Sequence, residues 1–223
     1  MKKLFTQLFA LVIIGTAFTS CMKNDDTDYE AENIKIEERI DSILNEDKRR
    51  IERFMNENGN FNLVEDSINI NYNYIAKKSK RGIWYEVVKS ASEESEKAYQ
   101  YSLNNSGTDL TYPKVKLKYT AKLLDGTVVQ EDEEGSIYDL GVRSTNIIKT
   151  IWDYSFFPYS IKFNGRDIKI AGLTKNGLKE GSILKVITPS LWAYGDKEVT
   201  VNGKKIPANS SLVYEFEVLS IEK

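Results

Sequence analysis

Two segments in the C-terminal half of the chain alternate between apolar and polar residues. Residues 115–121 read Val-Lys-Leu-Lys-Tyr-Thr-Ala, and residues 212–218 read Leu-Val-Tyr-Glu-Phe-Glu-Val. Side chains of a strand point alternately to its two faces, so this period of two is typical of strands with one buried face. The lysine-rich face of the first segment is expected to be solvated rather than to bind an anion. The chain should therefore build a sheet with one covered face.

The intervening residues supply the turns and the other strands of such a sheet. Asp125-Gly126 is a tight hairpin signal. Residues 183–187 are expected to form another apolar strand, which Pro189 ends. Residues 173–178 are the one short helical candidate in this half of the sequence. We expect an α+β domain in which an antiparallel sheet of about five strands is covered by one short helix.

The N-terminal half begins with an amphipathic helix over residues 32–57, and short strands follow it. Apolar residues recur in the helix at steps of three and four, with charged residues between them. Fewer than four heptads are present, so packing of the helix on its own domain is favoured over a coiled coil. Residues 82–88 are rich in aromatic and β-branched residues and are predicted to form a strand.

The first twenty residues resemble an export signal rather than part of the fold. Lys2 and Lys3 form a short positive region, and residues 8–18 form an apolar run that is too short to span a bilayer. The run ends just before Cys21, the only cysteine, and small residues precede it as in a bacterial lipobox. We expect lipidation at Cys21, so that the protein is a lipoprotein with a membrane anchor. A plain secreted protein is the alternative.

These features divide the chain into four parts. Residues 1–20 are expected to be the signal peptide, and the polar, acid-rich residues 21–32 a tether to the membrane. Residues 33–112 are expected to form an accessory segment of helix and strands. The principal boundary is placed before Pro113, so residues 113–223 form the C-terminal domain. The expected location is the cell envelope, on the periplasmic or the surface face of a membrane.

The composition excludes several kinds of chemistry. The chain contains no histidine, so it can form no Ser-His or Cys-His pair and no histidine-ligated metal site. Its single cysteine excludes an intramolecular disulfide. The formal net charge of −2 gives no reason to expect nucleic acid as a partner. Residues 131–134 are all carboxylates, but consecutive residues on a hairpin do not converge on one ion, so a solvated loop is expected there rather than a metal site.

Motifs of the C-terminal half resemble the FKBP-type peptidyl-prolyl cis-trans isomerase family over residues 113–222. The most specific are Ala-Tyr-Gly at residues 193–195 and Ile-Pro at residues 206–207, which precede a Leu-Val-Tyr strand. The Asp-Gly turn and a Leu-Gly pair at residues 140–141 occur in the family's order. The resemblance implies a half-wrapped antiparallel sheet around a short helix, with an apolar pocket between them. The residues before this domain look like the accessory segment of many exported bacterial members.

The resemblance assigns four catalytic residues to the pocket. Tyr119 would stand at the pocket wall and Tyr214 at its base. Tyr194 would donate a hydrogen bond to a carbonyl of the bound peptide, and the backbone of Ile206 would lie along that peptide. Tyr119 and Tyr214 would also be core residues in any β domain, so a purely structural role stays open for both.

The sequence departs from the family's pattern in three places. Val129 and Gln130 stand where the family usually has Phe-Asp, and the next pocket phenylalanine falls near Ser136. A long insertion, about residues 142–169, precedes the helix that should carry Gly-Trp at the pocket floor. Its aromatic residues are expected to pack in its own core, with a partner surface as the alternative. The further pocket residues expected are Val129, Gln130, Trp192 and Leu173, with Leu173 in the place of the tryptophan unless Trp152 fills that space.

The resemblance implies cis-trans isomerisation at proline, with proline-containing polypeptides as partners and exported proteins as substrates. This reaction needs a shaped apolar pocket and hydrogen-bond donors, but no cofactor or metal. The retained Ala-Tyr-Gly and Ile-Pro motifs favour an active but slow isomerase. The lost Phe-Asp pair favours the alternative, a catalytically inactive relative that binds peptides or partner proteins in the same groove.

Overall fold

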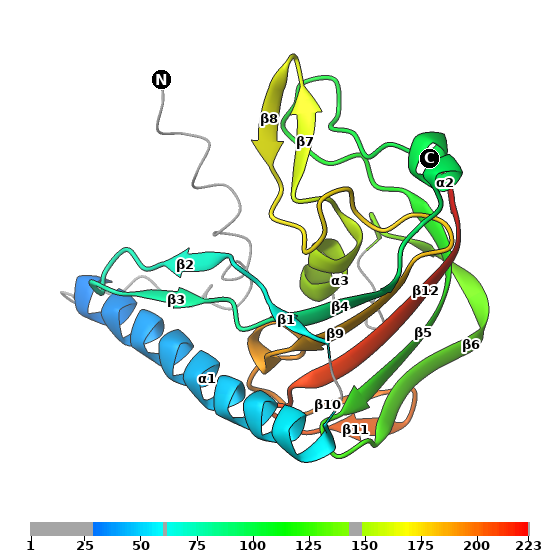
Figure 1. The fold of residues 1–223 in the computed structure, drawn as a ribbon. Helices are drawn as coiled ribbons and strands as arrows, with labels where there is room; N and C mark the ends of the chain where they lie inside the picture. The colour runs from blue at the N-terminus through cyan, green and yellow to red at the C-terminus, as the bar shows by residue number, and fades with distance from the viewer. Residues whose placement is uncertain (1–28, 60–61, 143–148, 223) are drawn as a thin grey trace.

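The computed structural model describes residues 29–59, 62–142 and 149–222. The helices are α1 (Tyr29–Asn58), α2 (Glu93–Ala98), α3 (Lys149–Phe156) and the 3-10 helix η1 (Ser190–Trp192). The strands are β1 (Val64–Glu65), β2 (Asn69–Asn71), β3 (Lys78–Lys80), β4 (Trp84–Lys89), β5 (Lys114–Leu123), β6 (Val128–Asp139), β7 (Ser160–Phe163), β8 (Arg166–Lys169), β9 (Ile183–Thr188), β10 (Val199–Val201), β11 (Lys204–Ile206) and β12 (Leu212–Glu222). In this part of the chain, a six-stranded sheet in the order β1-β4-β9-β12-β5-β6 forms the centre (Figure 1). The pairs β2–β3, β7–β8 and β10–β11 are separate hairpins.

The two alternating segments of the sequence became neighbouring strands, β5 and β12. Their register pairs Tyr119 with Phe216 and Ala121 with Tyr214, so aromatic residues of both strands share one face. The hairpin predicted at Asp125-Gly126 joins β5 to β6, and Gly126 has the positive φ, 89°, that favours glycine in such a turn. The sheet curves, and α3 lies over its concave face (Figure 1).

The predicted α+β class is confirmed, because an antiparallel sheet wraps partly around one short helix and follows α1 and short strands. The predicted position of the short helix is wrong. Residues 173–178 contain no helix, and α3 lies at Lys149–Phe156. Gly177 has φ of 74°, and a Cβ atom there would meet the carbonyl oxygen of Phe156 at 2.6 Å. The segment therefore makes a tight turn against the end of α3, and the predicted insertion contains both α3 and the β7–β8 hairpin.

The central sheet crosses the boundary expected at residue 112. Residues 82–88 do form a strand, β4, but this strand pairs with β9 in the central sheet. β1 pairs with the outer edge of β4. The long connection through α2 then carries the chain from β4 to β5, on the other side of β9 and β12. Part of the expected accessory segment is thus built into the same sheet as the C-terminal strands.

The N-terminal helix packs on its own domain, which confirms that prediction. The apolar stripe of α1 buries Leu44 and Ile51. In Figure 1, α1 runs along one end of the sheet with the β2–β3 hairpin beside it. Glu37 holds this hairpin, since its carboxylate accepts the backbone N–H groups of Asn73 and Tyr74, both at 2.7 Å. No coiled-coil partner is needed to bury this helix face.

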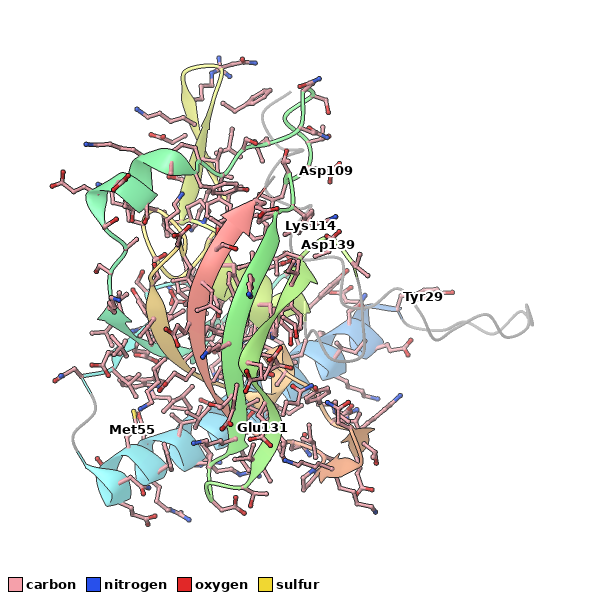
Figure 2. All side chains as sticks on the ribbon, turned by 90° about the vertical axis from the view of Figure 1, so that its right-hand side faces the viewer. Tyr29, Met55, Asp109, Lys114, Glu131 and Asp139 are labelled. Atoms are coloured by element: carbon pink, nitrogen blue, oxygen red, sulfur yellow. The ribbon has the colours of Figure 1, made fainter. Side chains whose placement is uncertain are left out.

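The outer face of the sheet is charged, and it includes the lysine-rich face that was predicted to be solvated, on which Lys116 is exposed and Lys118 is half-buried. Neighbours across the strands alternate in sign: Glu86 lies opposite Lys185, which lies opposite Glu215. In Figure 2, which looks onto β5 and β6, Lys114 and Asp139 lie together at one end of these strands, as their register requires. Opposite charges across a ladder stabilise it modestly while both remain in water.

The expected signal peptide, most of the tether and the lipidation site Cys21 lie outside the described residues. Within the described ranges, no helix combines the length and the apolar character that crossing a membrane requires.

Candidate active site

Two rows of side chains cross the concave face where β12, β5 and β6 run side by side. Directly opposed residues of antiparallel strands project to the same face. This places the predicted pocket residues Tyr119, Tyr214 and Gln130 together on one face. The rows are Tyr214, Ala121 and Gln130, and then Phe216, Tyr119 and Asp132.

Helix α3 places Trp152 against these rows. The ring centroid of Trp152 lies 5.2 Å from that of Tyr119, 5.3 Å from that of Phe216 and 5.4 Å from that of Tyr138. Phe156, one turn later, lies 5.3 Å from Phe216. Aromatic rings that pack edge to face at these distances attract each other, in addition to the stabilisation that comes from burying their apolar surface. We call Tyr119, Tyr138, Trp152, Phe156 and Phe216 the aromatic cluster.

The predicted donor Tyr194 lies in a turn that follows η1. The backbone N–H groups of Ala193 and Gly195 both donate to the carbonyl of Ser190, at 2.9 and 2.8 Å, which closes the turn. The N–H of Asn209 donates to the carbonyl of Gly195 at 2.9 Å, so the segment after the β10–β11 hairpin is tied to the same turn. Residues 190–195 form a unit that we call the Tyr194 turn.

Tyr119, Tyr194 and Tyr214 influence one another electrostatically beside the cluster. Burial raises the pKa of Tyr119, Tyr194 and Tyr214, and the neighbouring tyrosines raise the pKa of Tyr194 and Tyr214 further. The Gln130 side chain lies within reach of Tyr194 and offsets part of its shift. All three hydroxyls therefore stay neutral near pH 7 and keep their protons, so each is able to donate a hydrogen bond.

Sequence reasoning missed a carboxylate beside the aromatic cluster. Asp132 accepts a hydrogen bond from the Tyr138 hydroxyl at 2.6 Å and from the backbone N–H groups of Gly135 and Ser136 at 2.8 and 3.0 Å. Burial alone would raise the pKa of Asp132, but these hydrogen bonds lower it below its usual value. Asp132 lies opposite Tyr119 in the register, so alternation along β6 from Gln130 would have placed it on this face.

Most of the expected pocket wall is closed. Val129 is the unpaired residue of a bulge in β6 and is 1% exposed, and Gln130 is 2% exposed. Ile206 and Tyr214 are fully buried. Of the four residues that the resemblance assigns to catalysis, Tyr194 alone is partly exposed. Entry of a peptide therefore begins at the Tyr194 turn and requires side chains to move.

Two further predicted pocket residues are placed differently from expectation. The indole N–H of Trp192 donates to the carbonyl of Arg81 at 2.8 Å, and its ring packs on Tyr154 at 5.9 Å. Leu173 lies in the loop after β8, where its N–H donates to the carbonyl of Tyr154 at 2.8 Å. The tryptophan ring that packs under the two rows is Trp152, from the segment predicted to be an insertion.

Two surface hollows in the described part of the chain lie away from this site. One is lined by residues between 41 and 52 on α1 and the other by residues around α2. Charged and polar side chains dominate both linings. Neither is lined by the large apolar and aromatic side chains that recognition of a proline ring requires.

Comparisons with known proteins bear on the region that holds the site. The family model described as FKBP-type peptidyl-prolyl cis-trans isomerase matches residues 111–219. Among solved structures, the chain is similar to a peptidyl-prolyl cis-trans isomerase from Pseudomonas syringae pv. tomato, at 15% identity over 82% of this chain and 96% of that one, with a TM-score of 0.44. It is also similar to FkpA from Escherichia coli, at 20% identity over 90% and 74% of the two chains, with a TM-score of 0.43. A search among curated proteins gave no match.

The family match includes the strands β5, β6, β9 and most of β12, the helix α3 and the Tyr194 turn. It therefore spans every element that carries the tyrosine hydroxyls and the aromatic cluster. Residues 111–219, which hold the site, are therefore similar in sequence to the FKBP-type peptidyl-prolyl cis-trans isomerase family.

Proposed function

We propose that this domain catalyses cis-trans isomerisation of the peptide bond before proline in exported polypeptides, at a slow rate. The observation that carries the proposal is the placement of Tyr194. Its neutral hydroxyl lies beside the buried tyrosines Tyr119 and Tyr214, in a turn that is partly exposed. That hydroxyl is buried and makes no hydrogen bond of ordinary geometry within the described residues, so it is able to donate to a peptide carbonyl once neighbouring side chains move aside.

The reaction requires rotation about one bond and no proton transfer. Resonance gives the amide a rotational barrier of about 18–20 kcal/mol. The twisted bond has lost much of that resonance, so its carbonyl carries less negative charge than the planar form. Apolar surroundings therefore disfavour the planar ground state relative to the twist. The aromatic cluster supplies the dry surface, and Tyr194 holds a carbonyl of the peptide in place.

A second candidate function is peptide binding without catalysis. Val129 and Gln130 replace the pair that the family usually carries, and both are almost fully buried together with Tyr214. A site that must open before it accepts a peptide spends part of its binding energy on that opening. The same observation supports a slow isomerase and a binding module, so only the measured rate separates them.

A protease-free isomerisation assay on a Leu-Pro peptide tests the proposal in the full chain. We expect measurable catalysis, and Tyr194→Phe should lower kcat/KM by about 2- to 10-fold, since one hydrogen bond is worth about 0.5–1.5 kcal/mol. Tyr159→Phe is the matched control, because Tyr159 is 41% exposed and lies outside the aromatic cluster. Isomerisation at the uncatalysed rate, with peptide binding lost in Tyr194→Ala, would establish the binding module. Catalysis untouched by Tyr194→Ala would show that the site lies elsewhere.

Attachment to the cell envelope belongs to the same proposal and rests on the sequence. Cys21 lies outside the described residues, and its position after a short apolar run supports lipidation. Several acyl chains anchor a protein stably, because each buried CH₂ contributes about 0.8 kcal/mol. Cys21→Ser should move the protein from the membrane fraction to the soluble one. A chain that takes up no labelled fatty acid would refute the anchor.

A further inference from the structure

Asp47 carries a carboxylate from α1 into the interior, where the residue is 1% exposed. Its Oδ2 atom accepts the backbone N–H of Ser190 at 2.8 Å and the Ser190 hydroxyl at 2.6 Å. Its Oδ1 atom lies 3.5 Å from the guanidinium group of Arg50 on the same helix. The two hydrogen bonds join residues that are 143 positions apart in the sequence.

Ser190 is also the residue on which the Tyr194 turn closes. It begins η1, and its carbonyl accepts the N–H groups on both sides of Tyr194. The residue before it, Pro189, makes no side-chain hydrogen bond to the start of η1. Asp47 supplies from α1 the acceptor that a local cap would otherwise provide. A displacement of Ser190 therefore displaces the turn that carries Tyr194.

The same helix contacts the segments on either side of this turn. Arg50 donates from Nη1 to the carbonyl of Asn209 at 2.9 Å, and Asn209 is itself bonded to the turn. Arg39 pairs with Asp196, just after the turn. Exposed contacts of this kind contribute little, whereas hydrogen bonds to a buried carboxylate are strong. We call the pairs Asp47–Ser190, Arg50–Asn209 and Arg39–Asp196 the polar seam.

Stability alone does not account for a carboxylate at this position. Leu44 and Ile51 lie three positions before it and four after it, so apolar residues flank Asp47 on this face of α1, which carries a second carboxylate, Asp41, one turn before Leu44. Burial raises the pKa of Asp47, and the hydrogen bonds from Ser190, the nearby Ser211 hydroxyl and the charge of Arg50 offset the rise only in part. A raised pKa means that folding disfavours the ionised carboxylate. The carboxylate instead fixes the position of Ser190, because the hydrogen bonds that it accepts are directional.

We propose that Asp47 is a positioning residue, which fixes the Tyr194 turn through Ser190 and makes α1 part of the scaffold of the peptide site. The effect of Asp47 on catalysis rests on the proposed function. Its effect on the placement of the Tyr194 turn is independent of that function, because it can be measured without any substrate.

The test compares variants of two carboxylates on α1 in the full chain. Asp47→Ala removes both acceptor oxygens, and Asp47→Asn keeps one of them at nearly the same size. Asp41→Ala is the matched control, because Asp41 binds Lys77 and Ser79 of the β2–β3 segment and not the Tyr194 turn. The readouts are the NMR resonances of the Tyr194 amide and ring, and kcat/KM per folded molecule.

We expect Asp47→Ala to shift the Tyr194 resonances and to lower kcat/KM by about tenfold or more, equivalent to about 1.4 kcal/mol. Asp47→Asn should stay within about threefold of wild type, because an acceptor for Ser190 remains. Asp41→Ala should leave both readouts unchanged even where it lowers Tm.

Unshifted Tyr194 resonances in Asp47→Ala would overturn the proposal, as would equal shifts in Asp41→Ala. Should Asp47→Ala fail to fold, Ser190→Ala decides the question, because it removes the hydroxyl donor and leaves α1 intact. Shifted Tyr194 resonances in Ser190→Ala would then support the proposal, and unshifted ones would contradict it. A wild-type chain without isomerase activity would refute the proposed function but not the resonance test.

Discussion

The aromatic cluster and the polar seam hold the same site in different ways. In the cluster, Trp152 contacts Tyr119, Tyr138 and Phe216 through ring faces and edges, and it is fully buried. In the seam, the carboxylate of Asp47 meets Ser190 through two directed hydrogen bonds. Apolar burial contributes most of the stability but tolerates small displacements. Hydrogen bonds to a buried charge contribute less net stability and fix position.

This difference indicates that the aromatic cluster and the polar seam have separate roles. The cluster stabilises the sheet with α3 on it, and the seam sets where the Tyr194 turn lies relative to α1. Variants in the cluster should therefore act mainly on the free energy of unfolding. Variants in the seam should act mainly on the geometry of the site.

Trp152→Ala should have the largest effect on stability. It removes the ring at the centre of the cluster and leaves a cavity, so the free energy of unfolding in urea should fall by about 3–5 kcal/mol. Tyr159→Ala, at a partly exposed site outside the cluster, should cost about 1 kcal/mol or less. Equal losses in the two variants would contradict the tight packing of Trp152.

The double substitution Val129→Phe with Gln130→Asp tests the closed wall of the site. A phenylalanine at the almost fully buried Val129 should overpack the core and lower the free energy of unfolding by about 1–3 kcal/mol. The same change restores the family's pair and should raise kcat/KM if that pair is what the site lacks. Gln130→Asp alone is the control for the charge. Unchanged stability in the double variant would mean that the wall has room for the larger ring.

Tyr214→Phe should leave the free energy of unfolding unchanged or raise it by up to about 1 kcal/mol. Its hydroxyl is fully buried and has no hydrogen-bond partner within the described residues. Tyr101→Phe is the matched control, since the Tyr101 hydroxyl donates to the carbonyl of Leu178 at 2.7 Å and its loss should cost about 1 kcal/mol. Equal destabilisation in the two variants would show that the Tyr214 hydroxyl has a partner.

The smallest expected effect concerns how stability depends on pH, which should differ in sign between a variant of Asp47 and one of Asp41. The pKa of Asp47 is raised by burial, so its ionisation lowers wild-type stability as the pH rises above the usual carboxyl value of 3.8. Asp47→Asn should therefore gain stability relative to wild type over that rise. Burial would also raise the pKa of Asp41, but hydrogen bonds from Lys77 and Ser79 lower it. The loss of stability caused by Asp41→Asn should thus be present at neutral pH, and it should decrease as the pH falls below 3.8.

Urea titrations of both variants and wild type at several pH values measure these differences. We expect the stability difference from wild type to change with pH in opposite directions for the two variants. Slopes of the same sign would mean that the two carboxylates experience similar surroundings.

Local patterns in the sequence predicted most of the sheet. β5 and β12 follow from alternation, because one buried face imposes a period of two on any strand. The long helix α1 follows from its repeat of three and four residues. The position of the short helix α3 was not predicted from the sequence. This helix has only eight residues, and three of them, Ile151, Trp152 and Phe156, are fully buried. A segment of eight residues contains too few turns for a helical repeat to be recognised in the sequence.

The sequence predicted that Tyr119 lies on a strand and Tyr194 in a loop, because local patterns indicate both elements. Asp132 was missed because the run of carboxylates around it is typical of a solvated loop. The contact between Asp47 and Ser190 joins residues that are far apart in the sequence, and no local pattern indicates it. Such contacts are set by how the whole chain packs.

A proline-containing peptide is expected to bind at the Tyr194 turn, over the aromatic cluster. Titration of the full chain with a Leu-Pro peptide, followed by NMR of isotope-labelled protein, measures this binding residue by residue. We expect saturable shifts of the Tyr194 and Gly195 amides and of the Trp152 indole, with no comparable change at Glu96 in α2. Shifts confined to α2 or to the outer face of the sheet would contradict this expectation.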